Sequence, residues 1–545
     1  MKDELTKWIC RSVRPFTIVA DVGLTDVLQT VLDLGKKYQD LNITDLLVTP
    51  TTISKNVHQL AERYRSLLQP ILIEQAESNC LCLCPDLWTD KFRKVNYLGL
   101  TAVFIDKNYE LISIDLCCCE YQEVDKSGDS VLQAIRRQLD LYGLTSFMDN
   151  KKIVFTCDRG PNILKALRGQ PIILCFAHRI NNILKRCFYE TAKKKRIILA
   201  STTPIRQQKK SKLIIESSSD ESLSEDEVKT PSPLKYIESN TSFSELPSKA
   251  CELVDIITTS KQLVKYCGLN KSIQDAGGVV LKQSTVVRWL SLSNLLESID
   301  SSYEHLRSIL SRSSNTKQSF KLNKINIDGL KDLIRLLSVF KDVSVLVQTG
   351  TRPSLHMAYI AMNKLEHHLN GNDVDENGDF IHIDDRHEDI AHSYIRQQID
   401  EILGLKTEQH ELLTEPTKKK HKSMEDQFAD PDDNSNIHDI HTLPTASFRN
   451  DELDRYLRMN IEDIHKIPNP LPFWKHYQQK FPCLSLLARR LFSIPVTSAA
   501  VERSFSAAGL VVTERRSSLD PQTLHDILFV RSIQNILEQN QNFFS

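Results

Sequence analysis

The sequence contains no apolar run that approaches the roughly 18 to 20 residues needed to span a bilayer as a helix. Its first residues, MKDELTKWICRSV, also lack the apolar stretch and the small-residue cleavage site of a secretory leader. These two absences argue against membrane insertion and against secretion. The chain also lacks the clustered ligands of an N-terminal zinc finger, because Cys10 is the only cysteine among the first 79 residues.

An excess of either charge is also missing. The 69 basic and 70 acidic residues leave a formal net charge of −1. A protein that binds nucleic acid over much of its surface is usually strongly basic. The balance therefore argues against an undivided basic DNA-binding protein, although local basic patches can still bind DNA.

The 13 cysteines are odd in number, and several stand in short apolar runs, at residues 80–84 and 117–119. Adjacent positions of a strand cannot form a disulfide with one another without strain. We therefore predict reduced, buried thiols of an intracellular protein.

The chain of 545 residues, with 41% hydrophobic and 26% charged content, is long enough for about two to four domains. Residues 1–76 are predicted to form a small helical N-terminal domain. Apolar residues recur there at three- and four-residue spacing from Val27 to Leu34 and again from Ile53 to Ile73.

From about residue 79 the pattern changes to short apolar runs rich in β-branched and aromatic residues, which is typical of strands. Strands are predicted at Cys80–Cys84, Tyr97–Ile105, Leu111–Cys119, Lys152–Thr156 and Pro171–Phe176, with helices at Ser130–Tyr142 and Asn162–Leu167. This order of elements is that of the RNase H fold. We therefore predict an α/β protein with an RNase H-like core, a mixed five-stranded sheet with helices, whose first part is residues 77–190.

The rest of the chain alternates between polar and helical stretches. Residues 191–250 are rich in Ser, Lys, Glu and Pro, so we predict a disordered linker there. Residues 251–470 are predicted to be a long, mostly α-helical insertion with a disordered stretch at about 370–450. Residues 471–545 return to apolar helices that we expect to complete the core.

Two carboxylates occupy positions that suit a metal site. Asp86 follows the first predicted strand and Asp158 follows the fourth. In an RNase H-like sheet these strands are parallel neighbours, so carboxylates at their ends would lie side by side. Such a pair can hold two Mg²⁺ ions that promote phosphoryl transfer on a phosphodiester.

Five segments resemble motifs of the hAT transposase superfamily, in the order of that family. They read DLWTD at 86–90, CDRGPN at 157–162, CFAH at 175–178, TVVRWL at 285–290 and SAAVERSFS at 498–506. The last motif lies within residues 471–545, which resemble the hAT C-terminal dimerisation region. The resemblance is to the Hermes and hobo branch.

This resemblance implies a catalytic triad of Asp86, Asp158 and Glu502 that holds Mg²⁺ or Mn²⁺ and cleaves and joins DNA. It also implies that Trp289 stacks on a flipped base and that Arg288 contacts a nearby phosphate. Four further residues are expected to support the site: Trp88, Cys175, His178 and Arg503. The spacing of Cys175 and His178 suits zinc, but no second ligand pair follows at finger-like distance, so we expect no structural zinc.

Each residue alone has a simpler interpretation. An Asp after a strand often caps a helix or forms a turn, and Asp158 suits that role well. Trp289 could be a core aromatic of its helix. Asp90 is expected to be solvated or to support a ligand rather than to bind metal.

Two functions from different classes remain open at this point. The first is a metal-dependent transposase that acts on transposon-end-like DNA as a homodimer or higher oligomer. The second is a domesticated, catalytically silent nuclear protein that acts through dimerisation and DNA or chromatin binding. An RNase H-type hydrolase ranks last, because it shares the fold but not SAAVERSFS. Basic clusters at 193–196, 209–212 and 418–422 suit nuclear import, so we expect a nuclear location and no membrane partner.

Overall fold

The computed structural model describes residues 1–12, 14–38, 42–90, 92–185, 187–188, 248–265, 269–284, 291–312, 316–369, 394–400, 402, 452–459, 469–512 and 519–544. The two stretches that we predicted to be disordered lie almost entirely outside the described residues, as do Arg288 and Trp289. The chain divides into two compact units, one of Met1–Leu68 with Ser518–Ser545 and the other of Gln69–Ser517.

The larger unit contains a mixed five-stranded sheet with the order β3-β2-β1-β4-β5. The strands are β1 (Leu81–Thr89), β2 (Asn96–Ile105), β3 (Leu111–Glu120), β4 (Val154–Cys157) and β5 (Ile172–Leu174). The strand β2 is antiparallel to both β1 and β3, whereas β4 is parallel to both β1 and β5. The five predicted strands and the mixed α/β class are therefore confirmed.

The first strand is longer than predicted. It continues to Thr89 because its antiparallel ladder with β2 runs on to the pair Thr89 and Asn96. Its parallel pairing with the short β4 covers only Cys82 and Leu83. The prediction that Asp86 follows the strand is therefore wrong. Asp86 lies inside β1, in the part that extends past its contact with β4.

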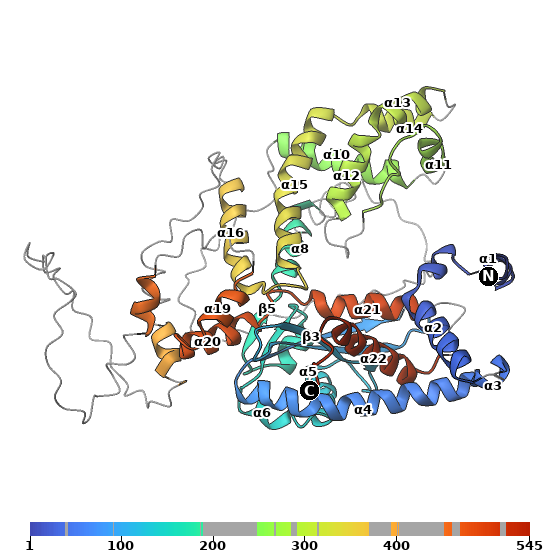
Figure 1. Cartoon of the computed structure of the whole chain (residues 1–545). Helices are drawn as coiled ribbons and strands as arrows, with labels where there is room; N and C mark the ends of the chain where they lie inside the picture. Colours follow the sequence, from blue (N-terminus) through green and yellow to red (C-terminus); the bar gives the residue numbers. More distant parts are fainter. Residues whose placement is uncertain are drawn as a thin grey trace, which may run out of the picture. The chain divides into compact units, whose positions relative to one another are not determined.

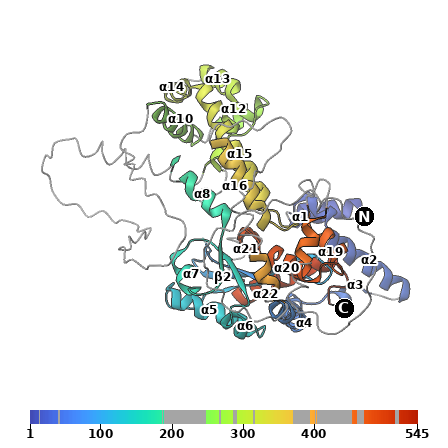
Figure 2. The same ribbon diagram turned by 90° about the vertical axis from the view of Figure 1, so that its left-hand side faces the viewer.

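Helices cover both faces of the sheet. Figures 1 and 2 show α21 (Ala499–Val511) on one side, and α5 (Gly128–Asp140) and α6 (Thr145–Asp149) on the other. The predicted helix at 162–167 is α7 (Pro161–Ala166), which packs against α5. Since both faces are covered, β2 is buried from Tyr97 to Ile105 and reads as a nearly continuous apolar run.

Gly99 of β2 permits the close approach of α21. A Cβ atom at this position would lie 2.5 Å from Phe505 and 2.6 Å from Val501, which is closer than real Cβ contacts. On the neighbouring strand, the ring of Trp88 stacks on Phe505 with 5.8 Å between centroids. The missing side chain at Gly99 therefore brings α21 against the centre of the sheet.

The remaining described elements of this unit are helices. They are α8 (Phe176–Lys185), α10 (Ser248–Val264), α11 (Leu269–Asp275), α12 (Ser291–Ser301), α13 (Tyr303–Arg312), α14 (Thr316–Asn323), α15 (Ile327–Val347), α16 (Leu355–Leu369), α19 (Leu471–Tyr477) and α20 (Pro482–Phe492). Leucines and isoleucines of α10 to α15 form one apolar core. A second core joins α8, α15 and α16 to Val496, just before α21, and Figure 1 shows α15 beside α16.

The smaller unit contains α1 (Lys2–Ser12), a short 3-10 helix (Phe16–Ala20), α2 (Val22–Lys37), α3 (Ile43–Leu46), the first part of α4 (Pro50–Glu77) and α22 (Pro521–Gln539). The predicted helices over 27–34 and 53–73 are confirmed. Contrary to their apolar spacing, however, no residue of α2 is buried in the single chain.

A buried ion cluster links α4 to α22 within this unit. Asp526 is 2% exposed and accepts hydrogen bonds from His58 and Arg65, whose guanidinium also contacts His525 at 2.8 Å. Burial alone would raise the pKa of Asp526, but the hydrogen bonds from Arg65 and His58 outweigh it and lower the pKa. Burial also lowers the pKa of His525, to about 4, so this imidazole is neutral at pH 7.

The cysteines whose side chains the structure describes form no disulfide, and those at positions 80, 82, 84, 117 and 118 are buried, as predicted, whereas Cys119 is half-buried. In the part of the chain that the structure describes, none of the helices combines the length and apolar character needed to cross a lipid bilayer.

We expect Gly99→Ala to lower the free energy of unfolding by about 2 kcal/mol, because the new methyl group overpacks the contact with α21. Urea unfolding of the full chain measures this change. The matched control is Gly509→Ala on α21, where no atom lies within 4 Å of an added Cβ. That control should stabilise the protein by up to about 1 kcal/mol, since alanine favours a helix over glycine. Equal effects of both substitutions would contradict the close-approach argument.

Asp526→Asn should destabilise the smaller unit by about 3 kcal/mol at pH 7, because it removes the buried counter-charge of the half-buried Arg65. The loss should shrink only as pH falls below about 4, where the lowered pKa of Asp526 stops contributing stability. Thermal unfolding followed at pH 7 and pH 3.5 tests both statements. Asp33→Asn, at an exposed ion pair with Lys36, is the control and should change stability little.

Candidate carboxylate site

Three elements supply the predicted triad. Asp86 lies in β1 opposite Gly99, and the backbone N–H of Leu87 donates to its Oδ1 atom at 2.7 Å. Asp158 follows directly on β4, where the N–H of Gly160 donates to its Oδ1 atom at 2.9 Å. Asp158 thus makes the turn that its sequence context also predicted, which leaves its second oxygen available for another role.

Glu502 lies in the first turn of α21. Ser498 donates to its Oε1 atom at 3.5 Å, and the Nε2 atom of His178 lies 3.8 Å from the same oxygen. Because α21 rests on β1, β2 and β3, its first turn brings Glu502 to the sheet face that carries Asp86. A motif more than 400 residues after Asp86 is thereby brought into the same site.

The electrostatics show how close the three carboxyl groups are. Burial, and then the charge of Asp158, raises the pKa of Asp86 to about 7. Burial, then Asp86, and more weakly Asp158 raise the pKa of Glu502 to about 7. Asp158 acts on both Asp86 and Glu502, and Asp86 acts on Glu502, so the three carboxyl groups lie within electrostatic range of one another. Neither Asp86 nor Glu502 is fully ionised at neutral pH.

The chemistry of this donor set suits a hard divalent cation. Carboxylate oxygens are the ligands that Mg²⁺ and Mn²⁺ prefer, and a cation would relieve the repulsion that raises both pKa values. Within the described residues, however, no group of three or more His, Cys, Asp or Glu side chains is arranged as a ready metal site. Each carboxylate accepts one local hydrogen bond, through a single oxygen.

Cys175 and His178 join the sheet to α21. Cys175 directly follows β5, and its Sγ atom accepts the backbone N–H of Ser498 at 3.3 Å. Burial raises the pKa of Cys175, so its thiol is protonated at neutral pH. Burial lowers the pKa of His178, and the charge of Asp158 opposes this effect. The CFAH motif therefore positions the start of α21 and places an imidazole beside Glu502.

The other predicted residues have mixed outcomes. Trp88 packs on α21, and Arg503 projects into solvent, where it donates to the carbonyl of Gln348 at 3.4 Å. Arg288 and Trp289 lie outside the described residues. Asp90, which we expected to be solvated or to support a ligand, is not solvated, because it is 1% exposed and forms an ion pair with Arg93 at 3.0 Å.

Comparisons with known proteins extend this description. Residues 452–533 match the hAT family C-terminal dimerisation region, and residues 2–52 match the Hermes transposase DNA-binding domain. Residues 2–52 were predicted only to be helical, and their similarity to a DNA-binding domain was not predicted. The one local signal is the set of four basic residues among the first 14, at positions 2, 7, 11 and 14.

Two curated relatives are similar to this chain over part of their length. The Hobo transposase of Drosophila melanogaster is 29% identical over 189 residues, which are 34% of this chain and 29% of that protein. The zinc finger BED domain-containing protein DAYSLEEPER of Arabidopsis thaliana is 34% identical over 89 residues, 16% of this chain and 12% of that protein. The matched segments therefore span less than a third of either relative.

We expect Asp86→Asn to stabilise the protein at pH 8 and not at pH 4. The pKa of Asp86 is raised from 3.8 to about 7 by folding, so the native state holds a proton that the unfolded state loses between those values. Stability therefore falls as pH rises through this window, and an uncharged amide removes the penalty. The gain at pH 8 should be about 2 kcal/mol, less than the full shift implies because this half-buried residue is partly screened.

Urea unfolding at the two pH values measures the effect in the absence of divalent cations. Asp129→Asn is the control, since this exposed carboxylate pairs with Lys165 at the surface. A gain from Asp86→Asn that is equal at both pH values would contradict the electrostatic account.

Proposed function

The chain belongs to the hAT transposase family, as a transposase or a protein derived from one, and we propose that it cleaves DNA and transfers strands. In this proposal Asp86, Asp158 and Glu502 form a metal-dependent DDE triad. The supporting observation is that Asp158, at the end of β4, raises the pKa of Asp86 in β1, and that both raise the pKa of Glu502 in the first turn of α21. Such a cluster destabilises the protein unless it binds a cation, which is typical of a functional site.

The sheet supports an RNase H-like core in the same proposal. Three antiparallel strands are followed by two strands parallel to β1, in the order β3-β2-β1-β4-β5. This order makes the first and fourth strands neighbours, as the proposed chemistry requires. The helices between α8 and α19 then correspond to the insertion predicted over residues 251–470.

Two divalent cations bound by the triad would supply activation of water or a 3′-hydroxyl and stabilisation of the leaving oxygen. The protein's own residues prepare the site. The hydrogen bonds from Leu87, Gly160 and Ser498 orient one oxygen of each carboxylate. His178 lies beside Glu502 with a pKa lowered by burial, so a neutral imidazole is available next to the carboxyl group.

DNA and a second copy of the chain are the partners in this function. Residues 2–52 are similar to a DNA-binding domain and residues 452–533 to a dimerisation region. Within the proposal, Arg288 and Trp289 contact a phosphate and a flipped base, the ends recognised are transposon-like, and the protein acts in the nucleus. Trp88, Cys175 and Arg503 hold or flank the triad.

The decisive experiment compares the full chain with its Glu502→Gln variant in Mn²⁺-dependent nicking and strand transfer on DNA. We expect the variant to lose at least about a hundredfold in rate, because it removes a charged ligand while preserving side-chain shape. Asp129→Asn is the matched control and should retain full activity.

The outcomes separate the two functions that the sequence left open. Activity that depends on Glu502 and on Mn²⁺ supports the transposase chemistry. A folded dimer that binds DNA but shows no nicking in either form would overturn it in favour of a catalytically silent DNA-binding protein.

A further inference from the structure

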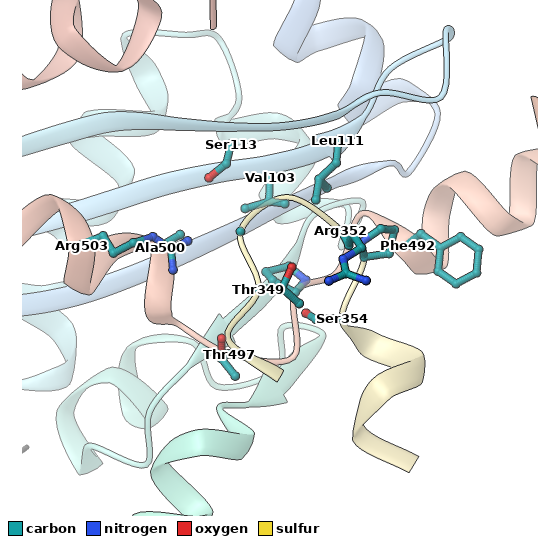
Figure 3. A pocket seen from close by; sticks show the side chains of 13 residues that line it. Val103, Leu111, Ser113, Thr349, Arg352, Ser354, Phe492, Thr497, Ala500 and Arg503 are labelled. Atoms are coloured by element: carbon teal, nitrogen blue, oxygen red, sulfur yellow. The ribbon is translucent and has the colours of Figure 1, made fainter. Parts of the chain in front are cut away.

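A small pocket lies beside α21, on the sheet face that this helix covers (Figure 3). Val103 and Ser113 of the paired strands β2 and β3 form its floor. The loop after α15 and the first turns of α21 form its sides. It encloses about 30 Å³ of free space, which is room for roughly one water-sized group.

The charged side chains that line this pocket are both positive. Arg352, from the loop after α15, and Arg503, from α21, both line it, and no carboxylate does. In the part of the chain that the structure describes, neither arginine forms an ion pair. Figure 3 shows the two side chains entering from opposite sides of the pocket, with Thr349 between them in this view.

Two features of the loop arrange these donors. An added Cβ at Gly350 would lie 3.0 Å from Nη2 of Arg503, so the glycine lets the guanidinium lie against the loop. The Nη1 atom of Arg503 donates to the carbonyl of Gln348 at 3.4 Å, which holds the group there.

The hydroxyl of Thr349 adds a third donor. Its Oγ1 atom is buried and has no hydrogen-bond partner in the described structure. A buried hydroxyl without a partner costs about 1 to 3 kcal/mol, so the pocket favours a ligand that supplies an acceptor.

We propose that this pocket binds a phosphate of the DNA backbone. Guanidinium groups pair with phosphate oxygens through two parallel hydrogen bonds, and the enclosed space accepts one such oxygen while the rest of the phosphate stays at the mouth. Arg503 directly follows Glu502 on α21, so one helix holds both the third carboxylate and a phosphate ligand. The pocket therefore sets where the strand lies relative to the triad. This inference rests on the proposed function, whose substrate is DNA.

The test measures affinity of the full chain for a labelled DNA duplex by fluorescence anisotropy at several salt concentrations, without divalent cations. Arg352→Ala should weaken binding about tenfold and reduce the slope of log affinity against log salt by about 1, as expected for one lost phosphate contact. Arg352→Lys should restore the slope but only part of the affinity, because lysine keeps the charge and loses the paired geometry. Arg335→Ala is the control, since this exposed arginine of α15 lies outside the pocket and should change neither quantity.

Substitution of single DNA phosphates by neutral methylphosphonates then locates the contact. At one position, the methylphosphonate should weaken DNA binding by the wild-type chain and leave DNA binding by the Arg352→Ala variant unchanged. Thr349→Val should weaken binding without changing the salt slope, because it removes a hydrogen bond but no charge.

Other outcomes would overturn the proposal. DNA binding that is unchanged by Arg352→Ala, with no sensitive phosphate position, would show that the pocket holds no DNA strand. If inorganic phosphate raises the unfolding temperature of the wild-type chain but not of Arg352→Ala, and both bind DNA with the same affinity, the pocket is a site for a free anion instead. If the chain shows no nicking but binds DNA in a manner that depends on Arg352, the catalytic triad is wrong and the phosphate-binding pocket is still supported.

Discussion

The contact between α21 and the sheet at Gly99 is the constraint on which the candidate site depends. The absent side chain lets Val501 and Phe505 reach the backbone of β2, and Trp88 packs on Phe505 from the neighbouring strand. Glu502 and Arg503 follow Val501, so the same contact fixes both. The packing brings Glu502 near Asp86 and Asp158, whose charges raise its pKa. Apolar packing thus holds together carboxylates that repel one another.

Much of the sheet could be predicted from the sequence, because the relevant signals are local. Runs of β-branched and aromatic residues identified all five strands, and β2 matches its predicted range to within one residue. The end of β1 could not be predicted, since it depends on how far the ladder with β2 continues. Asp86 for that reason lies within a strand rather than after one. The proximity of Glu502 to Asp86 has no local signature at all, and only the resemblance of SAAVERSFS to a known motif anticipated it.

Features that depend on contacts between different elements could not be predicted from the sequence. Asp90 is buried and paired with Arg93, a contact that its position in the sequence does not reveal. The apolar spacing of α2 predicted a helix correctly, but it does not identify what the apolar side chains contact. The arginine pocket joins residues about 150 positions apart, and the spacing of Arg352 and Arg503 along the chain carries no sign of it. Charge and hydropathy patterns describe one element at a time, whereas these sites form between elements.

The ion cluster of the smaller unit affects when this unit can fold during synthesis. The shared hydrogen-bond acceptor of His58 and Arg65 is Asp526, which follows more than 450 residues later in the chain. Contacts of such long sequence separation form late, because a long loop must close first. During synthesis, the first part of α4 therefore lacks its ionic partner on α22 until Asp526 has emerged from the ribosome. A nascent chain that stalls before α22 exposes the unpaired face of α4, a surface that chaperones and proteases can recognise.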